Sequence, residues 1–282
     1  MFASPFTVIF SVFMALPIVA SLLLSFTDFD IGDVHNPIGT DFIGLGNYAD
    51  AWSDEKFRQA AFNTGYFVVI GVPLNLGIAL ALAVALNSGI RRFRALFRVG
   101  YYLPVVTSIV AIAVVWRYLL QPEGGLVNVL LSYVGVNGPN WLGNPSLAMP
   151  SIILIAVWRG LGFTMVIFLA ALQGVDAQLR EAARVDGAGS WRVFRHITLP
   201  LLRPAMLFAS VTTTIGYLQV MEEPFVLTGG GPLNKTVSIS MYVYEQGFNF
   251  FNLGYASAMA YMLFLGMIAL TIVQFRLLRS QT

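Results

Sequence analysis

The sequence contains no cysteine, two histidines and few charged side chains, which make up 11% of its 282 residues. Without cysteine the chain forms no disulfide, zinc–thiolate site or iron–sulfur site, and it has no thiol nucleophile. His35 and His196 are isolated along the chain, so neither a metal site nor a proton relay is expected. Soluble proteins have about 25% charged residues, and this chain has too few to cover a globule in water.

Long apolar runs are what the sequence has instead. Apolar side chains make up 57% of it and the mean hydropathy is +0.75, values typical of an integral membrane protein. A helix needs about 20 apolar residues to cross a hydrocarbon core of about 30 Å. We therefore expect an all-α polytopic membrane protein, a single transmembrane domain over 1–282 with six transmembrane helices at 5–26, 66–86, 99–120, 150–172, 204–225 and 256–275.

The basic residues are distributed unevenly around these spans. Eleven Lys and Arg residues follow the second, fourth and sixth spans, against three on the other side of the predicted membrane. Because cytoplasmic loops carry the excess of Lys and Arg, we expect both termini and the segment 174–203 in the cytoplasm. The first span has no basic leader, so it is predicted to be retained and not removed as a signal peptide. The net charge of +2 gives no reason to expect a nucleic-acid partner.

The segment 174–203 has the pattern of two short helices. Asp176 is placed to cap the first helix, in which apolar residues follow at i, i+3, i+4 spacing. Gly187 separates it from a second helix in which Trp191 and Phe194 share one face. Amphipathicity alone leaves two interpretations open, an anchor on the membrane surface and a knob that docks on another protein.

Three short motifs follow one another in this segment: Glu181-Ala182-Ala183, Asp186-Gly187-Ala188 and Ile197-Thr198-Leu199-Pro200. Three more lie outside it: Phe42-Ile-Gly-Leu-Gly-Asn-Tyr48, Leu227-Thr-Gly-Gly-Gly-Pro232 and Gly254-Tyr-Ala-Ser-Ala258. In order and spacing the first set resembles the EAA loop in permease subunits of bacterial binding-protein-dependent ABC importers. With the second set, the resemblance covers nearly the whole chain and is to the maltose-type carbohydrate uptake family.

That resemblance implies a coupling helix that docks on a separate ATPase subunit. Small residues permit close approach, Glu181 can accept hydrogen bonds across such an interface, and Gly187 lets the backbone turn. The pattern of the family places the ATPase contacts at Glu181, Ala182, Ala183, Asp186, Gly187, Ala188 and Phe194. It places contacts with an extracytoplasmic binding protein at Gly229, Gly230, Gly231 and Pro232.

By the same resemblance the chain is a transport subunit, not an enzyme, and holds no cofactor of its own. Two ATP-binding cassette subunits would bind ATP and Mg, and a second, homologous permease would complete a heterodimer. A binding protein would deliver a carbohydrate to this assembly in the cytoplasmic membrane of a prokaryote. The glycine-rich stretch before Lys235 is not a P-loop, because Asn234 stands where a glycine is needed and Pro232 interrupts the loop.

Polar residues inside the predicted spans are candidates for substrate contact, because they are costly in lipid. A sugar needs hydrogen-bonding groups for its hydroxyls and an aromatic plane for its ring. The maltose-type family draws such contacts from positions that match Thr213 and Tyr217 of span five and Gly160 and Phe163 of span four. Together with nearby polar residues, the predicted substrate set is Arg159, Gly160, Phe163, Thr213, Tyr217, Gln219, Glu222 and Glu223.

Several alternatives stay open from the sequence. The threonines of span five could bond their own helix, and Glu222 and Glu223 could lie in the headgroup layer. Arg159 lies about 14 Å inside its span at 1.5 Å per residue, where it needs a partner: one of these glutamates, an anionic substrate group such as phosphate, or a helix end. A polyol or glycerol phosphate is therefore an alternative substrate, and an ion-coupled secondary transporter is the alternative class.

Overall fold

The computed structural model describes residues 4–35, 40–88 and 94–278, and these ranges are helical apart from turns, loops and one isolated β-bridge. The α-helices are Ser4–Phe10 (α1), Leu16–Leu24 (α2), Gly46–Ser53 (α3), Glu55–Ser88 (α4), Arg94–Val106 (α5), Ile109–Leu119 (α6), Leu126–Tyr133 (α7), Ala148–Gln173 (α8), Ala177–Val185 (α9), Ser190–Val193 (α10), Leu199–Leu201 (α11), Arg203–Leu218 (α12), Glu222–Thr228 (α13), Ile239–Tyr244 (α14) and Leu253–Leu278 (α15). The shorter turns are 3-10 at Ile31–His35 and π-helical at Ser11–Ala15, Phe194–Thr198 and Glu245–Asn249.

Four of the described helical stretches are long and apolar enough to cross a membrane: Ser4–Leu24, Glu55–Asn87, Ala148–Gln173 and Leu253–Leu278. They correspond to the first, second, fourth and sixth predicted spans. The all-α membrane fold is therefore confirmed, and the two remaining spans differ from the prediction.

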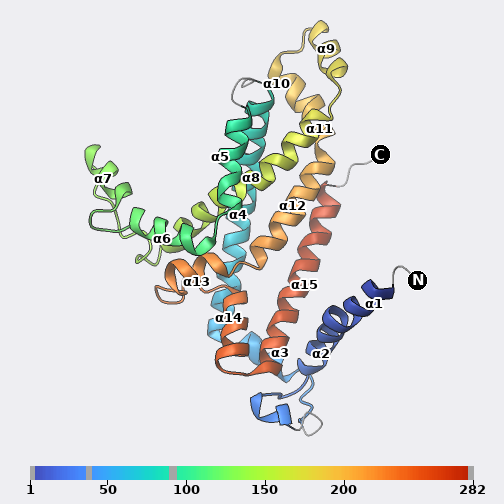
Figure 1. The fold of residues 1–282 in the computed structure, drawn as a ribbon, viewed down its shortest axis with the longest axis vertical. Coiled ribbons are helices and arrows are strands. Elements are labelled where there is room, and N and C mark those ends of the chain that lie inside the picture. The colour runs from blue at the N-terminus through green and yellow to red at the C-terminus, as the bar shows by residue number, and fades with distance from the viewer. Residues whose placement is uncertain (1–3, 36–39, 89–93, 279–282) are drawn as a thin grey trace.

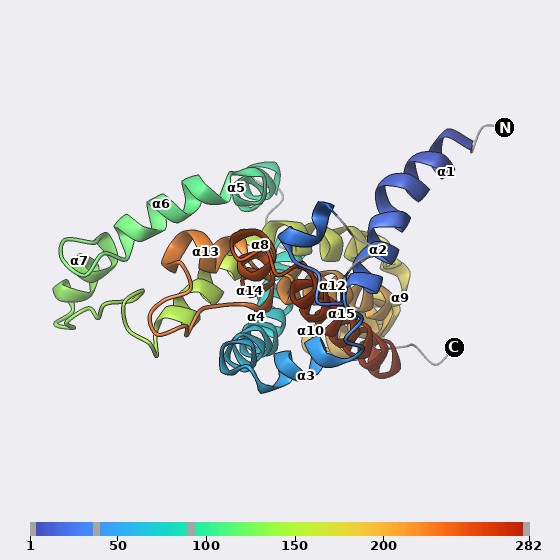
Figure 2. The same ribbon diagram turned by 90° about the horizontal axis from the view of Figure 1, so that it is seen from below.

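The predicted span 99–120 is broken, because its two halves meet at an angle of 106°. Pro104 has no amide hydrogen for the helix ladder, and Ser108 adopts an extended ψ of 130° just before α6 begins. The arm of α6 and α7 consequently projects sideways from the bundle (Figures 1 and 2).

The predicted span 204–225 is too long, because α12 ends at Leu218 and a separate helix, α13, begins at Glu222. Met221 leaves the helical region at φ −139°. Pro224 is tolerated in the first turn of α13, where an amide hydrogen has no partner within the helix, and the two glutamates there suit the positive helix end. The break turns α13 toward α6 and α8.

The core of the bundle is α8, which packs along α4 and also contacts α5 and α12. Its fully buried side chains include Ile152, Met165 and Phe168, and Phe67 of α4 meets them. Gly162 permits the close approach of α5. A Cβ at this position would overlap the carbonyl of Tyr101 and lie 2.8 Å from the Cα of Tyr102.

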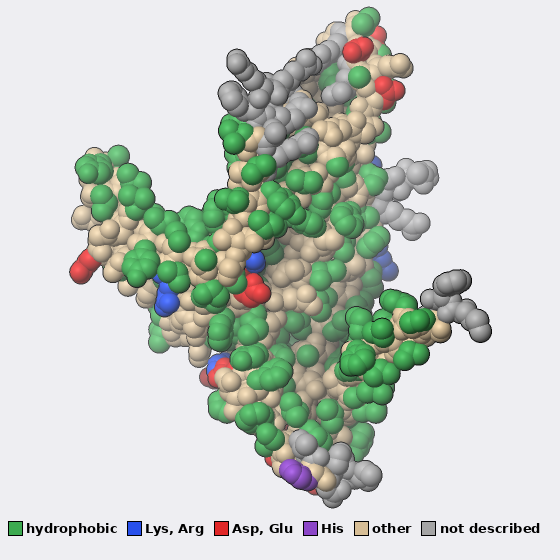
Figure 3. Space-filling view, in the orientation of Figure 1, with side chains coloured by type: hydrophobic (Ala, Val, Ile, Leu, Met, Phe, Trp, Pro, Cys, Tyr) green, Lys and Arg blue, Asp and Glu red, His purple; other side chains and the backbone are tan. Residues whose placement is uncertain are grey.

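The N-terminal helix formed by α1, the π-turn and α2 stands apart from this bundle (Figure 1), and none of its apolar window is buried. Its contact with the rest lies near its end, where Tyr261 donates a 2.5 Å hydrogen bond to the carbonyl of Ile18. Apolar side chains cover this helix and the α6–α7 arm (Figure 3). At one end of the long axis lies α9, and at the other lies the segment that joins α2 to α3 (Figure 1).

We expect Gly162→Ala to lower the melting temperature of the detergent-solubilised protein by several degrees, since overpacking a tight contact costs about 1–3 kcal/mol. Gly266→Ala on α15 is the control, because no atom lies within 4 Å of the added methyl group. Equal melting temperatures for the two variants would contradict the tight α5–α8 contact.

Candidate functional site

A cavity of about 240 Å³ lies where α4, α5, α8, α12 and α13 meet. It brings together four of the predicted substrate residues, Arg159, Gly160, Tyr217 and Glu223. The remaining lining residues are small or apolar: Phe67, Val105, Ala156, Gly216 and Val220. The cavity therefore combines an apolar wall with a few convergent polar groups, as small-molecule sites do.

The charge at the cavity is an ion pair between two helices. Arg159 Nη2 on α8 lies 2.6 Å from Glu223 Oε1 on α13, and Nη1 lies 3.9 Å from Glu222 Oε2. The Glu223 side chain is buried, whereas that of Glu222 is 64% exposed. Of the partners that the sequence left open for Arg159, the structure selects Glu223.

Tyr217 is held edge-on against Phe67, with ring centroids 5.0 Å apart. Gly71 makes room for the ring, because a Cβ there would lie 2.7 Å from Tyr217 Cε2. Gly160 has a similar role, since its Cβ would lie 3.6 Å from the Tyr217 hydroxyl and 3.0 Å from Asn75 Nδ2. The two predicted residues Gly160 and Tyr217 are thus neighbours.

Sequence reasoning missed Asn75, a buried residue of α4 beside the cavity. Its Nδ2 lies 3.4 Å from the carbonyl of Val157, and its Oδ1 has no hydrogen-bond partner among the described residues. The signal was available, because Asn75 is an amide in an otherwise apolar stretch of the second predicted span.

Four predicted substrate residues do not line this cavity. Phe163 and Gln219 are exposed, Thr213 is half-buried on α12, and Glu222 contacts only the rim through Arg159. Thr212 donates to the carbonyl of Phe208 at 2.8 Å, the local bonding expected of a threonine in a membrane helix.

The segment 174–203 forms the two predicted helical pieces at one end of the molecule (Figure 1). Asp176 caps α9, since its Oδ1 accepts from the amide of Gln178 at 2.9 Å. Gly187 ends α9 at φ +81°, and the amide of Ala188 then bonds the carbonyl of Ala183 at 2.9 Å. A side chain at position 187 would strain this left-handed turn.

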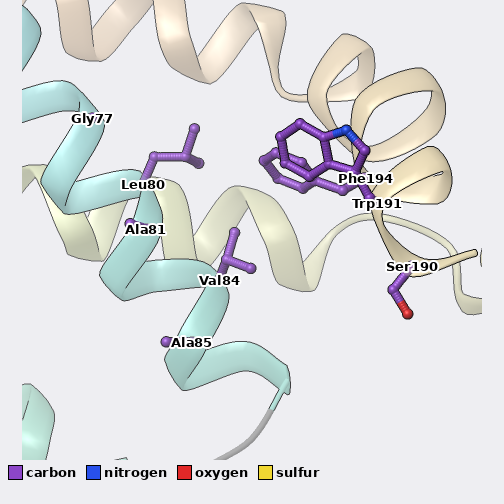
Figure 4. Close-up of a pocket in the computed structure, with 8 residues that line it drawn as sticks. All are labelled: Gly77, Leu80, Ala81, Val84, Ala85, Ser190, Trp191 and Phe194. Carbon is purple, nitrogen blue, oxygen red and sulfur yellow. The ribbon is translucent and has the colours of Figure 1, made fainter.

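The predicted ATPase contacts gather on this end. Glu181, Ala182, Asp186 and Gly187 are exposed, and Ala183, Ala188 and Phe194 are half-buried. The rings of Trp191 and Phe194 lie 5.7 Å apart and, with Leu80 of α4, face an apolar groove of about 590 Å³ (Figure 4). The groove lies between this segment and the long helix α4.

The glycine-rich stretch is a compact turn between α13 and α14 (Figure 1). Gly229 and Gly230 have positive φ, and Thr236 closes the turn by donating to the carbonyl of Gly231 at 2.8 Å. Asn63 of α4 fixes this turn, because its Nδ2 donates to the carbonyls of Asn234 and Val237 at 2.8 and 2.9 Å. Of the predicted contacts here, Gly229 is exposed, Gly230 buried, and Gly231 and Pro232 half-buried.

Comparison with known proteins identifies the family. Residues 76–281 match the model of the binding-protein-dependent transport system inner membrane component. The chain belongs to this family. It is a transport component and not an enzyme.

Relatives of this permease span its whole length. It is 37% identical over 286 residues to the lactose transport system permease protein LacF of Rhizobium radiobacter, covering 100% of this chain and 94% of that protein. It is 31% identical over 279 residues to the arabinooligosaccharides transport system permease protein AraP of Bacillus subtilis, covering 98% and 87%.

The fold is that of a solved transporter chain. A chain of the bacterial alginate ABC transporter, in complex with an alginate pentasaccharide-bound periplasmic protein, superposes with a TM-score of 0.80 at 24% identity. The match covers 98% of this permease and 91% of that chain. At this identity the likeness concerns the fold alone.

A polar cluster ties the permease together where α3 meets α4. Asp54 accepts hydrogen bonds from Tyr242 at 2.5 Å and Tyr255 at 2.9 Å, and Lys56 pairs with Glu245 at 2.6 Å. Burial raises the pKa of the Asp54 carboxyl. The hydrogen bonds from the two tyrosines and from two backbone amides lower it by more, so the pKa lies below its usual value. Burial and the bond to Asp54 raise the pKa of Tyr242 to about 12.

We expect Arg159→Ala to reduce transport by at least about tenfold, because Glu223 then stays buried without its counter-charge. The measurement is uptake by the assembled transporter, normalised to the amount of permease in the membrane. Arg117→Ala is the control, since Arg117 is an exposed arginine of α6 outside the cavity.

A second variant separates packing from function. Arg159→Ala combined with Glu223→Gln removes both charges and is expected to restore the amount of protein without restoring transport. Full transport by either variant would assign Arg159 to packing.

Proposed function

We propose that this chain is the permease subunit of an ATP-driven ABC importer that carries a carbohydrate across the cytoplasmic membrane by alternating access. The observation that carries the proposal is the cavity, in which the Tyr217 ring and hydroxyl adjoin an apolar wall within the membrane bundle. Relatives that match nearly the whole chain are named as a lactose permease and an arabinooligosaccharide permease, which supports a sugar as the cargo.

The proposed partners are a second, homologous permease, two ATPase subunits that bind ATP and Mg, and an extracytoplasmic binding protein. The N-terminal helix supports the second permease as a partner. None of the apolar residues in its membrane-spanning stretch is buried, so its apolar surface is available to a neighbouring chain. The exposed surface of Glu181–Ala188 supports the ATPase contact, and the turn at Gly229–Pro232 supports contact with the binding protein.

In the proposed cycle the loaded binding protein docks on the side of α14, and ATP closes the ATPase pair. Motion of α9 and α10 then reaches α4 through the groove at Trp191 and Phe194 and opens the cavity outward. ATP hydrolysis returns the bundle to its starting form. Both termini and α9 lie in the cytoplasm in this arrangement, as the distribution of basic residues favours.

The test is reconstitution of the permease with its partner subunits in proteoliposomes. ATP hydrolysis and uptake are measured with lactose, arabinotriose and maltose, each added with the binding protein, and with glycerol 3-phosphate. We expect at least one of the three sugars to stimulate both. Stimulation by no carbohydrate would contradict the proposal.

We also expect Glu181→Lys to abolish transport while the binding protein still captures sugar, because the exposed Glu181 would place the wrong charge at the ATPase contact. The measurement is sugar-stimulated ATP hydrolysis by the reconstituted complex, with sugar binding to the isolated binding protein as the control. Normal uptake by this variant would remove Glu181 from the coupling surface.

A further inference from the structure

Three buried side-chain atoms in the described ranges have no hydrogen-bond partner: Asn75 Oδ1, the Tyr217 hydroxyl and Gln274 Oε1. Asn75 and Tyr217, which carry two of the three atoms, are neighbours, since Asn75 Nδ2 and the Tyr217 hydroxyl lie beside the same face of Gly160. Buried polar groups are almost always hydrogen-bonded, and an unpaired one is most costly inside a membrane bundle. The unpaired Tyr217 hydroxyl at the cavity wall, with the incompletely paired Asn75 beside it, therefore indicates a group that the cavity receives.

The geometry around Asn75 fixes its side chain but leaves the oxygen available. The residue is 1% exposed, and its Nδ2 is directed to the carbonyl of Val157 on α8. The Tyr217 ring packs edge-on against Phe67 and occupies the space that Gly71 leaves free. Tyr217 also lines the cavity. Asn75 Nδ2, with one hydrogen left to donate, thus lies on the same side of Gly160 as a hydroxyl that can both donate and accept.

The charges of the cavity restrict what this pair can receive. Arg159 is the one basic residue among the lining residues, and Glu223 occupies its guanidinium at 2.6 Å. Glu222 adds a second carboxylate 3.9 Å from the same group. A phosphate or a sugar carboxylate would have to displace Glu223 while lying beside both acids, so like charges disfavour an anionic ligand here.

We propose that Asn75 is a positioning residue that orients the Tyr217 hydroxyl toward a hydroxyl group of an uncharged glycan. Asn75 Nδ2, which lies 3.4 Å from the Val157 carbonyl, donates its second hydrogen to the Tyr217 oxygen, and the phenol hydrogen is then directed to an oxygen of the glycan. This inference rests on the proposed function and adds to it a residue of α4 and the neutral class of the cargo.

The experiment uses the complete reconstituted transporter and measures labelled-sugar uptake and ATP hydrolysis in the same vesicles. The probe is whichever of lactose, arabinotriose and maltose the wild type takes up fastest. The variants are Tyr217→Phe, which removes one oxygen atom, Asn75→Leu, and the two combined. Tyr66→Phe on α4 is the matched control, because Tyr66 is 38% exposed and does not line the cavity.

We expect each single variant to lower sugar transported per ATP by roughly fivefold, the effect of one lost hydrogen bond, with ATP hydrolysis unchanged. The double variant is expected to match Tyr217→Phe, since Asn75 acts through the tyrosine. A purely structural role would lower uptake and ATP hydrolysis in proportion and would overturn the proposal. So would an unchanged ratio in Tyr217→Phe, or a further loss in the double variant.

Two outcomes separate this inference from the proposed function. If the wild type carries one of the three sugars and the variants carry it equally well, the pair has no role and the importer assignment stands. If glycerol 3-phosphate or a uronic acid disaccharide stimulates transport and the three neutral sugars do not, the neutral class is overturned.

Discussion

The ion pair between Arg159 and Glu223 joins α8 and α13, two of the five helices that meet at the cavity. A guanidinium this deep in a membrane bundle needs a counter-charge, and a straight helix from residue 204 to 225 would carry Glu223 onward along the axis of α12. The chain instead breaks between Leu218 and Glu222, so that α13 turns and brings Glu223 against α8. The same break leaves Tyr217 at the end of α12, where its hydroxyl adjoins the cavity.

The long helix α4 connects the three parts of the molecule that the function needs. At its start lies the Asp54 cluster, which holds α14 and α15 through two tyrosine hydroxyls. Phe67 lines the cavity, and Leu80 lines the groove with Trp191 and Phe194. A rigid element that lines both the cavity and the groove shared with segment 174–203 can carry a displacement between them.

Much of the architecture was predictable, because the length of an apolar run and the residues that cap or end a helix are local properties of the sequence. The spans over α4, α8 and α15, the cap at Asp176 and the turn at Gly187 all follow from neighbouring residues. The bend at Ser108 and the early end of α12 were not predicted, since a window of about 20 residues averages over the few polar residues at each break. Thr107 and Ser108 stand at the first break and Gln219 at the second, and a count of hydropathy cannot register a change of direction.

The sequence by itself determined that this chain is a helical membrane protein of its family, because composition, span length and motif spacing depend only on the order of residues along the chain. Which polar residues meet was decided by the tertiary structure. Asn75, Arg159 and Tyr217 come from three different helices, and only their packing places Arg159 and Tyr217 at one cavity and Asn75 beside it. The pairing of Arg159 with Glu223 likewise depends on a turn of the backbone that hydropathy does not encode.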